Sequence, residues 1–327
     1  MISINILIDI VLLTMLLFTT VAIVRLRSLF AIVMLSGIYS LLSANIFVIL
    51  DAVDVAFTEA AVGAGISTVL MLATIGITGY EMKDRSNIKR MVPLIVVTIT
   101  GAVLVYGTLD MPAFSDSLAP IHQHVAPRYI LDSPTEIGIP NMVTSVLASY
   151  RGYDTMGEVI VVFAALIGVL SLIGIREPKV APNYTEPPAL PILQVMAKFM
   201  IPFIILFALY VQFHGDFGPG GGFQAGVIFS VAIILYTLTF SQYDGMRLVP
   251  PNVLKILAAT GVLIYGGTGI WTLLKGGNFL NYSVLAKTSV GGQHLGILII
   301  EFGVGLTVAA AMMLIFFAFV SRGDNKL

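Results

Sequence analysis

The sequence predicts an all-α, polytopic transmembrane protein with about nine spans, and two observations support this class. Hydrophobic residues make up 57% of the 327 residues and charged residues only 11%, whereas an average soluble chain carries about 25% charged residues. Several apolar runs also reach the roughly 20 residues that a helix needs to cross a bilayer. These features exclude a soluble domain.

Each expected span is a separate apolar run bounded by charged, proline-rich or glycine-rich residues. The first run has no basic segment before it and no small-residue cleavage site after it, so we interpret it as a retained span and not as a signal peptide. The nine expected spans are 5–24, 29–50, 55–80, 91–109, 154–175, 195–213, 222–240, 253–273 and 294–320.

The basic residues predict the orientation of these spans. If the spans alternate, 13 of the 17 lysines and arginines fall on one side, and the other side holds Arg128, Arg151, Lys275 and Lys287. Cytoplasmic loops carry an excess of Lys and Arg. We therefore expect the N-terminus outside and the C-terminus in the cytoplasm of a bacterial or archaeal plasma membrane.

Composition also limits the chemistry of the chain. There is no cysteine, which excludes disulfides, thiolate metal sites, Fe–S clusters and cysteine nucleophiles. His122 and His124 lie two residues apart in a polar loop, where a solvated loop is favoured over a metal site. The net charge of −1 gives no sign of a nucleic-acid partner. No cofactor, metal or enzymatic site is predicted.

Four acids fall within predicted spans, where an ionisable residue costs about 2.5–3.5 kcal/mol on insertion scales and usually has a function or a partner. Glu59 precedes a run of small residues that permits close helix packing, and it is interpreted as part of an ion or proton path or as a helix cap. Glu301 is the deepest acid in the last span, in a functional or a buried structural role. Asp9 is interpreted as structural.

Glu158 is the fourth acid, and Asp154 lies four residues before it on the same helix face. Asp154 is placed to cap the span, with Arg151 as a structural charge partner. In the functional alternative Glu158 is a proton relay, and the predicted ion or proton path comprises Glu59, Glu158, Glu301 and Asp154. No lysine lies in the middle of a span. Because a self-sufficient antiporter needs a relay of ionisable groups across the membrane, the chain is predicted to be one part of a larger complex.

A glycine-rich loop, "HGDFGPGGGFQ" at 214–224, interrupts the apolar sequence. It lacks the Lys-Ser/Thr of a phosphate-binding loop and lies between two membrane helices. A tight turn with positive φ angles and close packing is favoured over ion binding by His214, Asp216 or Gln224. Its signature residues are His214, Gly218, Pro219, Gly220, Gly221, Gly222, Phe223 and Gln224.

These motifs resemble known membrane complexes. Residues 214–228 and 291–313, the latter reading "GGQHLGILIIEFGVGLTVAAAMM", resemble the B subunit of the Mrp (Mnh) multisubunit cation/proton antiporters. The segment "DVAFTEAAVGAGIS" at 54–67 resembles the MbhD segment of membrane-bound hydrogenases, and 143–172 resembles the MbhE segment; both also occur in the tail of the large A subunit of Mrp.

The resemblance implies a domain order of an MbhD-like module (1–110), an MbhE-like module (111–180), a proline-rich linker (181–194) and a module like the Mrp B subunit (195–327). It implies a non-enzymatic component of an Na⁺/H⁺ antiporter in the lipid bilayer, with the large A and D subunits and the C, E, F and G subunits as partners. Glu59 and Glu158 match glutamates implicated in ion transport. A hydrogenase-like membrane arm and a pure assembly scaffold remain the alternatives.

Overall fold

The computed structural model describes residues 4–82, 87–113, 116–176 and 191–323, and in these ranges the chain is helical, with a single isolated bridge between Ser28 and Glu81 in place of any sheet. Nine helices in this part of the chain are long and apolar enough to span a membrane. The predicted fold class is therefore confirmed. Most of the predicted linker, 181–190, lies outside the described residues, and the predicted domain boundaries stay a prediction.

The spans follow the expected runs closely. The third span is continuous but changes its helix type: an α-helical part is followed by a π-helical segment and then by a second α-helical part. The nine spans are α1 (Ile4–Arg25), α2 (Leu29–Ile49), α3 (Val53–Glu59) with η1 (Ala60–Ile66) and α4 (Ser67–Thr78), α5 (Asn87–Thr108), α10 (Gly152–Leu172), α11 (Pro191–His214), α12 (Gly222–Thr239), α14 (Pro251–Leu274) and α15 (Ser289–Gly323).

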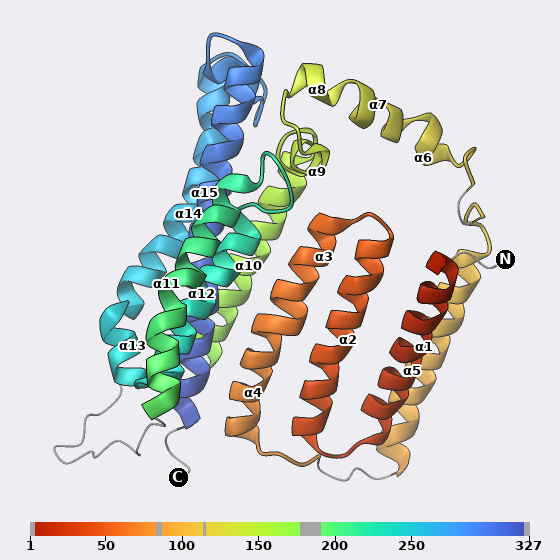
Figure 1. Cartoon of the computed structure of the whole chain (residues 1–327), viewed down its shortest axis with the longest axis vertical. Helices are drawn as coiled ribbons and strands as arrows, with labels where there is room; N and C mark the ends of the chain where they lie inside the picture. The colour runs from red at the N-terminus through yellow and green to blue at the C-terminus, as the bar shows by residue number, and fades with distance from the viewer. Residues whose placement is uncertain (1–3, 83–86, 114–115, 177–190, 324–327) are drawn as a thin grey trace.

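The segment between α5 and α10 is not the plain loop that the sequence suggests. Two of its short helices begin at or next to a proline, whose fixed φ suits the first helical turn. This segment contains α6 (Pro120–Gln123), α7 (Val125–Leu131), α8 (Ser133–Glu136), α9 (Met142–Thr144) and the π-helical η2 (Ser145–Tyr150). Figure 1 shows α6, α7 and α8 as an arch over the ends of α1, α2 and α3.

The N-terminus and the C-terminus lie at opposite ends of the membrane helices, as an odd number of spans requires (Figure 1). We call the end that carries residues 116–141, the turn before α12 and residues 275–288 the arch face. The opposite end, with α13 (Gln242–Leu248) and the C-terminus, carries the basic residues Arg27, Arg247 and Arg322, and we call it the basic face.

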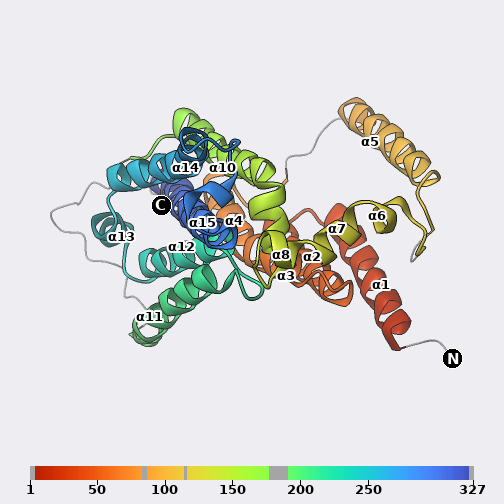
Figure 2. The same cartoon turned by 90° about the horizontal axis from the view of Figure 1, so that it is seen from above.

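The packed core centres on α15. This helix contacts α10, α12, α14 and α4, and its side chains Ile297, Leu314, Phe316 and Phe317 are fully buried. The helices α1 to α4 form a row beside this bundle, and α5 stands apart from it (Figures 1 and 2). The row meets the bundle through η1 and α4, which pack on α12 and α15. This junction holds two of the acids of interest, Glu59 and Glu301.

Candidate ion path at the junction of the two helix groups

The glycine-rich stretch forms a tight turn between α11 and α12. Gly221 has a φ of 121°, a backbone conformation that L side chains rarely adopt and that glycine permits. The N–H of Gly221 donates to the carbonyl of Val211 at 3.1 Å, which closes the turn onto the last residues of α11. At the start of the turn, the ring of His214 stacks on Tyr210 with 4.7 Å between centroids.

Glu301 caps the helix that follows this turn. The Gly222 N–H, at the start of α12, donates to Oε2 of Glu301 at 2.7 Å. A β-carbon at Gly222 would collide with the main-chain carbonyl of Glu301, so only glycine lets α12 and α15 approach this closely. Because a helix N-terminus carries unsatisfied N–H groups and partial positive charge, it stabilises this carboxylate inside the protein.

Glu59 lies at the point where α3 becomes π-helical, and it is half-buried. A β-carbon at Gly63 would lie 2.5 Å from Oε1 of Glu59 and 2.6 Å from Oγ of Ser40. The carboxylate of Glu59 and the hydroxyl of Ser40 therefore face the same small space between α2 and the third span. Short π-helical segments inside helices are frequent at functional sites, and this one begins directly after the carboxylate.

A side-chain hydrogen bond connects Thr58, the residue before Glu59, to the helix that Glu301 caps. Nε2 of Gln224 donates to Oγ1 of Thr58 at 2.8 Å. Thr58 precedes Glu59 on α3, and Gln224 lies two residues after Gly222 on α12. Gln224 is itself buried. The first turn of α12 thus lies between the two acids and is hydrogen-bonded on both sides.

A second set of hydrogen bonds, which we call the clasp, lies on the arch face above these acids. Nδ2 of Asn141 donates to the carbonyls of Gly215 at 3.1 Å and Gly218 at 2.9 Å, and lies 3.4 Å from Oδ1 of Asp54. Oγ1 of Thr144 donates to the carbonyl of Gly215 at 2.7 Å. The clasp therefore ties α3, α9 and the glycine-rich turn together.

The last span joins the clasp through His294. Its Nδ1 lies 3.2 Å from Oδ2 of Asp216, and its Nε2 lies 3.3 Å from the carbonyl of Gly138. Both ring nitrogens thus have a partner in the turn or in the arch. His214, the first residue of the predicted signature, has a stacking role in this geometry, and His122 and His124 are exposed. Among the described residues, no group of three or more His, Asp or Glu could hold a metal ion.

Glu158 and Asp154 lie away from this junction. Both are exposed on α10, and Oδ2 of Asp154 pairs with Nε of Arg151 at 2.6 Å. One buried group lies between α10 and the rear helices: the hydroxyl of Tyr265 on α14 donates to the carbonyl of Gly152 at 2.7 Å. Tyr265 is fully buried, so this bond fixes the start of α10 against α14.

The structure brings Glu59, Glu301, Gly221, Gly222 and Gln224 together, whereas Asp154 and Glu158 lie on another surface. Pro219 lines an apolar pocket of about 420 Å³ with residues of α2 and α3, and Phe223 packs against the rear core. The sequence analysis missed four residues that contact these groups, although each has a recognisable feature in the sequence. Ser40 and Tyr265 are polar residues inside apolar runs, and Thr58 directly precedes Glu59. Asn141 precedes a helical run, as an N-cap residue does.

Comparison with known protein families finds three domains in this one chain. Residues 192–314 match the model described as "Domain related to MnhB subunit of Na+/H+ antiporter". Residues 14–79 match the MbhD model and residues 89–188 match the MbhE model, which are described as the D and E subunits of MBH. The third span with Glu59 thus falls in the first of these domains, α10 with Glu158 in the second, and the glycine-rich turn with Glu301 in the third.

Curated relatives agree with these domains. The putative antiporter subunit mnhB2 of Staphylococcus haemolyticus is 32% identical over 131 residues, which cover 37% of this chain and 92% of the relative. The B subunit of the Na⁺/H⁺ antiporter of Bacillus subtilis is 30% identical over a region that covers 36% of this chain and 88% of the B subunit. The probable A/B subunit of a K⁺/H⁺ antiporter of Rhizobium meliloti is 24% identical over 88% of this chain. The matched region covers only 31% of the length of that relative.

Solved structures show the same relationship in three dimensions. A chain of the Mrp complex from Dietzia sp. DQ12-45-1b superposes with a TM-score of 0.76 at 25% identity, over 97% of this chain and 35% of that chain. A chain of the membrane-bound sulfane sulfur reductase, an archaeal respiratory complex, superposes with a TM-score of 0.54 at 27% identity, over 71% of this chain and 98% of that one. The chain therefore belongs to the Mrp/Mnh antiporter subunit family and joins MbhD, MbhE and MnhB domains in one polypeptide.

Proposed function

We propose that this chain is a membrane subunit of a multisubunit monovalent cation/proton antiporter in a bacterial or archaeal plasma membrane. It acts in secondary transport and catalyses no covalent chemistry. The named relatives, Na⁺/H⁺ and K⁺/H⁺ antiporter subunits, support this function. The Mrp subunits that the resemblance implies are its partners, and its basic face lies in the cytoplasm, as the distribution of Lys and Arg predicts.

The observation that carries the mechanism is the arrangement of Glu59 and Glu301 on either side of the first turn of α12. Glu59 has no fixed cationic partner among the described residues, so its carboxylate is free to exchange a proton or a cation. Glu301 is held by the N–H of Gly222 and fixes the position of α12. We assign transport to Glu59 and positioning to Glu301.

Substitution of Glu59 tests this assignment. In everted vesicles that contain the assembled complex, Glu59→Gln should reduce Na⁺- or K⁺-driven collapse of the pH gradient at least tenfold, because the amide cannot exchange a proton. Asp9→Asn is the matched control, since Asp9 is a single acid in the outlying span α1, and it should transport normally. Normal exchange by Glu59→Gln in a fully assembled complex would refute the role.

A membrane-arm component of an energy-converting redox complex is the second candidate. The superposition on the sulfane sulfur reductase chain supports it, because this chain covers 98% of that chain. The higher TM-score and the fuller coverage of this chain favour the antiporter. Purification of the intact complex in mild detergent separates the two: Fe–S or Ni–Fe subunits that co-purify would favour the redox complex. A pure scaffold would leave transport unchanged in every acid variant that assembles.

A further inference from the structure

Glu59 and Thr68 face the same neighbouring helix, α2, although they lie nine residues apart in the third span. In a regular α-helix nine residues make about two and a half turns, so two such positions point in opposite directions. The π-helical segment η1 lies between them. Its i→i+5 hydrogen bonds give wider turns, and this smaller rotation per residue brings both side chains towards α2.

Two positions on α2 meet these side chains. Ser40 faces the carboxylate of Glu59, and a β-carbon at Gly37 would lie 2.8 Å from Oγ1 of Thr68. Positions 37 and 40 are three residues apart and therefore neighbours on one helix face. We call the surface formed by Gly37, Ser40, Glu59 and Thr68 the hydroxyl seam. It extends from Glu59 towards the basic face over a distance on the order of 10 Å.

The hydroxyl of Thr68 is unusual among the hydroxyls of these two helices. Ser36 on α2 and Thr74 on α4 donate to the carbonyl four residues earlier, at 3.0 Å and 2.8 Å. Oγ1 of Thr68 is buried and has no hydrogen-bond partner among the described residues. The carbonyl four residues earlier, that of Ala64, also faces Gly37. A donor and an acceptor therefore face the same glycine.

A buried polar group without a hydrogen bond costs about 1–3 kcal/mol, so the Thr68 hydroxyl needs a partner from outside the chain. Buried waters occupy such positions and bond to the unsatisfied groups. The absence of a side chain at Gly37 leaves the approach to this hydroxyl open, because a methyl group there would meet it directly. Water in the seam would lie between the hydroxyl of Thr68 and the oxygens of Ser40 and Glu59.

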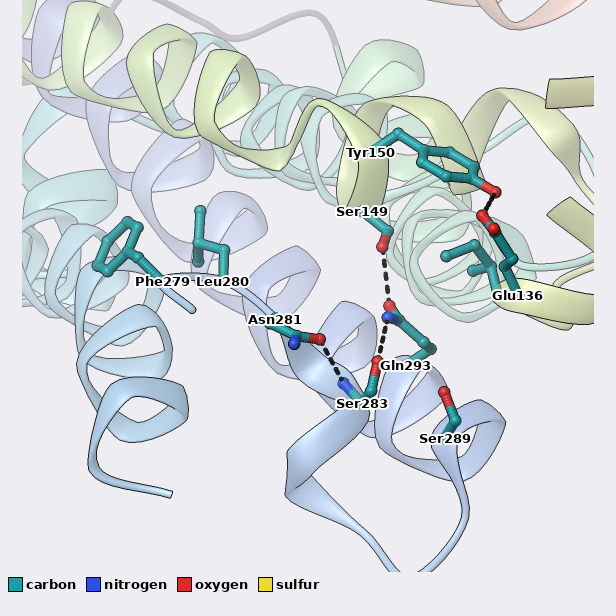
Figure 3. A pocket seen from close by; sticks show the side chains of 10 residues that line it. Glu136, Ser149, Tyr150, Phe279, Leu280, Asn281, Ser283, Ser289 and Gln293 are labelled. Atoms are coloured by element: carbon teal, nitrogen blue, oxygen red, sulfur yellow. Dashed lines mark hydrogen bonds between the residues drawn. The ribbon is translucent and has the colours of Figure 1, made fainter. Parts of the chain in front are cut away.

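The polar pocket of about 400 Å³ on the arch face differs from the seam, because its side chains bond to one another. Oγ of Ser149 donates to Oε1 of Gln293 at 2.8 Å, and Nε2 of Gln293 donates to Oγ of Ser283 at 3.1 Å (Figure 3). These bonds join the second and third domains. They give the pocket a structural explanation that the Thr68 hydroxyl lacks.

The carboxylate of this pocket is also compensated. Glu136 accepts a hydrogen bond from the hydroxyl of Tyr150 at 2.5 Å and lies 3.4 Å from Nη2 of Arg128. Burial, together with this hydrogen bond, raises the pKa of Tyr150 to about 12, so the phenol stays neutral and continues to donate. Glu59, in contrast, has no ion-pair partner among the described residues.

We propose that the hydroxyls of Ser40 and Thr68 relay the proton that Glu59 exchanges, through water in the seam and towards the basic face. A hydroxyl is both donor and acceptor. Each hydroxyl accepts a proton from the oxygen on one side and gives its own to the oxygen on the other, so it carries no charge after the transfer. The relay rests on the transport role of Glu59 in the proposed function.

Substitution of Thr68 tests the relay in everted vesicles that contain the assembled complex. Thr68→Val removes the hydroxyl and should slow cation-driven collapse of the pH gradient about tenfold. Thr68→Ser keeps the hydroxyl and should exchange at the wild-type rate. Thr74→Val is the matched control, because that hydroxyl already donates to a carbonyl of its own helix, and it should also exchange normally.

Substitution of Ser40 gives a second, independent measurement on α2. Ser40→Ala should slow exchange in the same way as Thr68→Val. Ser36→Ala, one turn earlier, removes a hydroxyl that donates to a carbonyl of its own helix, and it should leave the exchange rate unchanged.

Thermal unfolding separates a relay from a structural role. The hydroxyl of Thr68 has no bond to lose among the described residues, so Thr68→Val should leave the unfolding temperature unchanged or raise it. Exchange should fall in the same preparation. A lower unfolding temperature in Thr68→Val would show a structural role and overturn the relay.

Four transport results would also overturn it: wild-type exchange by Thr68→Val, wild-type exchange by Ser40→Ala, an equal loss in Thr74→Val, or a loss in Thr68→Ser. The relay and the proposed function fail separately. If Glu59→Gln loses exchange and Thr68→Val does not, the role of Glu59 stands and the relay is wrong. If Thr68→Val loses exchange and Glu59→Gln does not, Thr68 acts apart from Glu59, and the relay is again wrong.

Discussion

The outlying helices α1 and α5 and the two central helices of the last domain, α12 and α15, have very different shares of buried residues. Within this chain, 72% of the span formed by α15 and 61% of α12 are buried, compared with 6% of α1 and none of α5. All four are apolar enough to span a membrane. Because lipid tails are as apolar as leucine side chains, exposure of a helix to lipid carries no penalty of the kind found in water.

The difference shows that apolar sequence alone does not decide which membrane helices pack together. The last domain packs where small residues let backbones approach and where polar groups pair across helices, as at Gly222 and Glu301. In α5, by contrast, the glycines Gly101 and Gly107 have no neighbouring atom within reach of an added methyl group. The outlying helices leave apolar surface for lipid or for other subunits.

The largest expected effect is at Gly222. Gly222→Ala places a methyl group against the main chain of Glu301, where neither helix can move without breaking its packing, and it should cost about 3 kcal/mol of stability. Gly101→Ala in α5 is the matched control, because no atom lies near its added methyl group. Thermal unfolding in detergent measures both. A similar loss for the two variants would show that the two helix groups are equally packed.

The clasp should have the next largest effect, because it joins the two groups. Asn141→Ala removes the donor to the carbonyls of Gly215 and Gly218, at a cost of about 1–3 kcal/mol. Amide hydrogen exchange in residues 214–221 should become about tenfold faster. Asn252→Ala on the basic face, where the exposed asparagine accepts a hydrogen bond from Lys255, should leave exchange unchanged. Unaltered exchange in Asn141→Ala would mean that the turn is held by its own backbone.

The third expected effect is smaller and is a shift in the titration of Tyr150, whose hydroxyl donates to Glu136 on the arch face. Its folded pKa of about 12 lies above the ordinary tyrosine value of 10.0, so the folded state binds the proton more tightly. The stabilisation is complete below about pH 10 and is lost as the pH rises through 12. The difference in ultraviolet absorbance between the wild type and Tyr150→Phe should show one phenol titrating near 12. In Glu136→Gln the midpoint should move down, and a midpoint near 10 in the wild type would contradict the contact.

The smallest effect is expected at Asp154. Its ion pair with Arg151 is exposed on both sides, and such pairs contribute about 0–1 kcal/mol. Asp154→Asn should therefore change neither the unfolding temperature nor cation/proton exchange measurably. A loss of exchange with normal assembly would place Asp154 in the path that its sequence position suggested, and would extend that path to α10.

The sequence was sufficient for the spans, because apolar length follows directly from the thickness of a bilayer. It was not sufficient for the site. Glu59, Glu158 and Glu301 are equivalent as acids inside apolar runs, yet only the fold shows that a helix N-terminus holds Glu301, that Glu59 faces Ser40, and that Glu158 is exposed. These differences arise from contacts between residues far apart in the chain, and no local pattern contains them.

The arch and the pocket show the same limit. The sequence indicated only a polar loop between the expected fourth and fifth spans, but the arch depends on where its short helices can pack. The partners of Asn141 lie 87, 74 and 77 residues away, and those of Gln293 come from two other segments. A polar side chain in a loop shows no partner until the chain is folded.

The sequence by itself determined that this is a multispan helical membrane protein with an MnhB-type glycine-rich turn, because composition, run length and motif are local properties. The tertiary structure decided what that turn does. It brings the start of α12 against Glu301 on one side and Thr58 beside Glu59 on the other. The physical reason is that a helix N-terminus needs an acceptor, and only the packing of α12 against α15 determines which carboxylate supplies it.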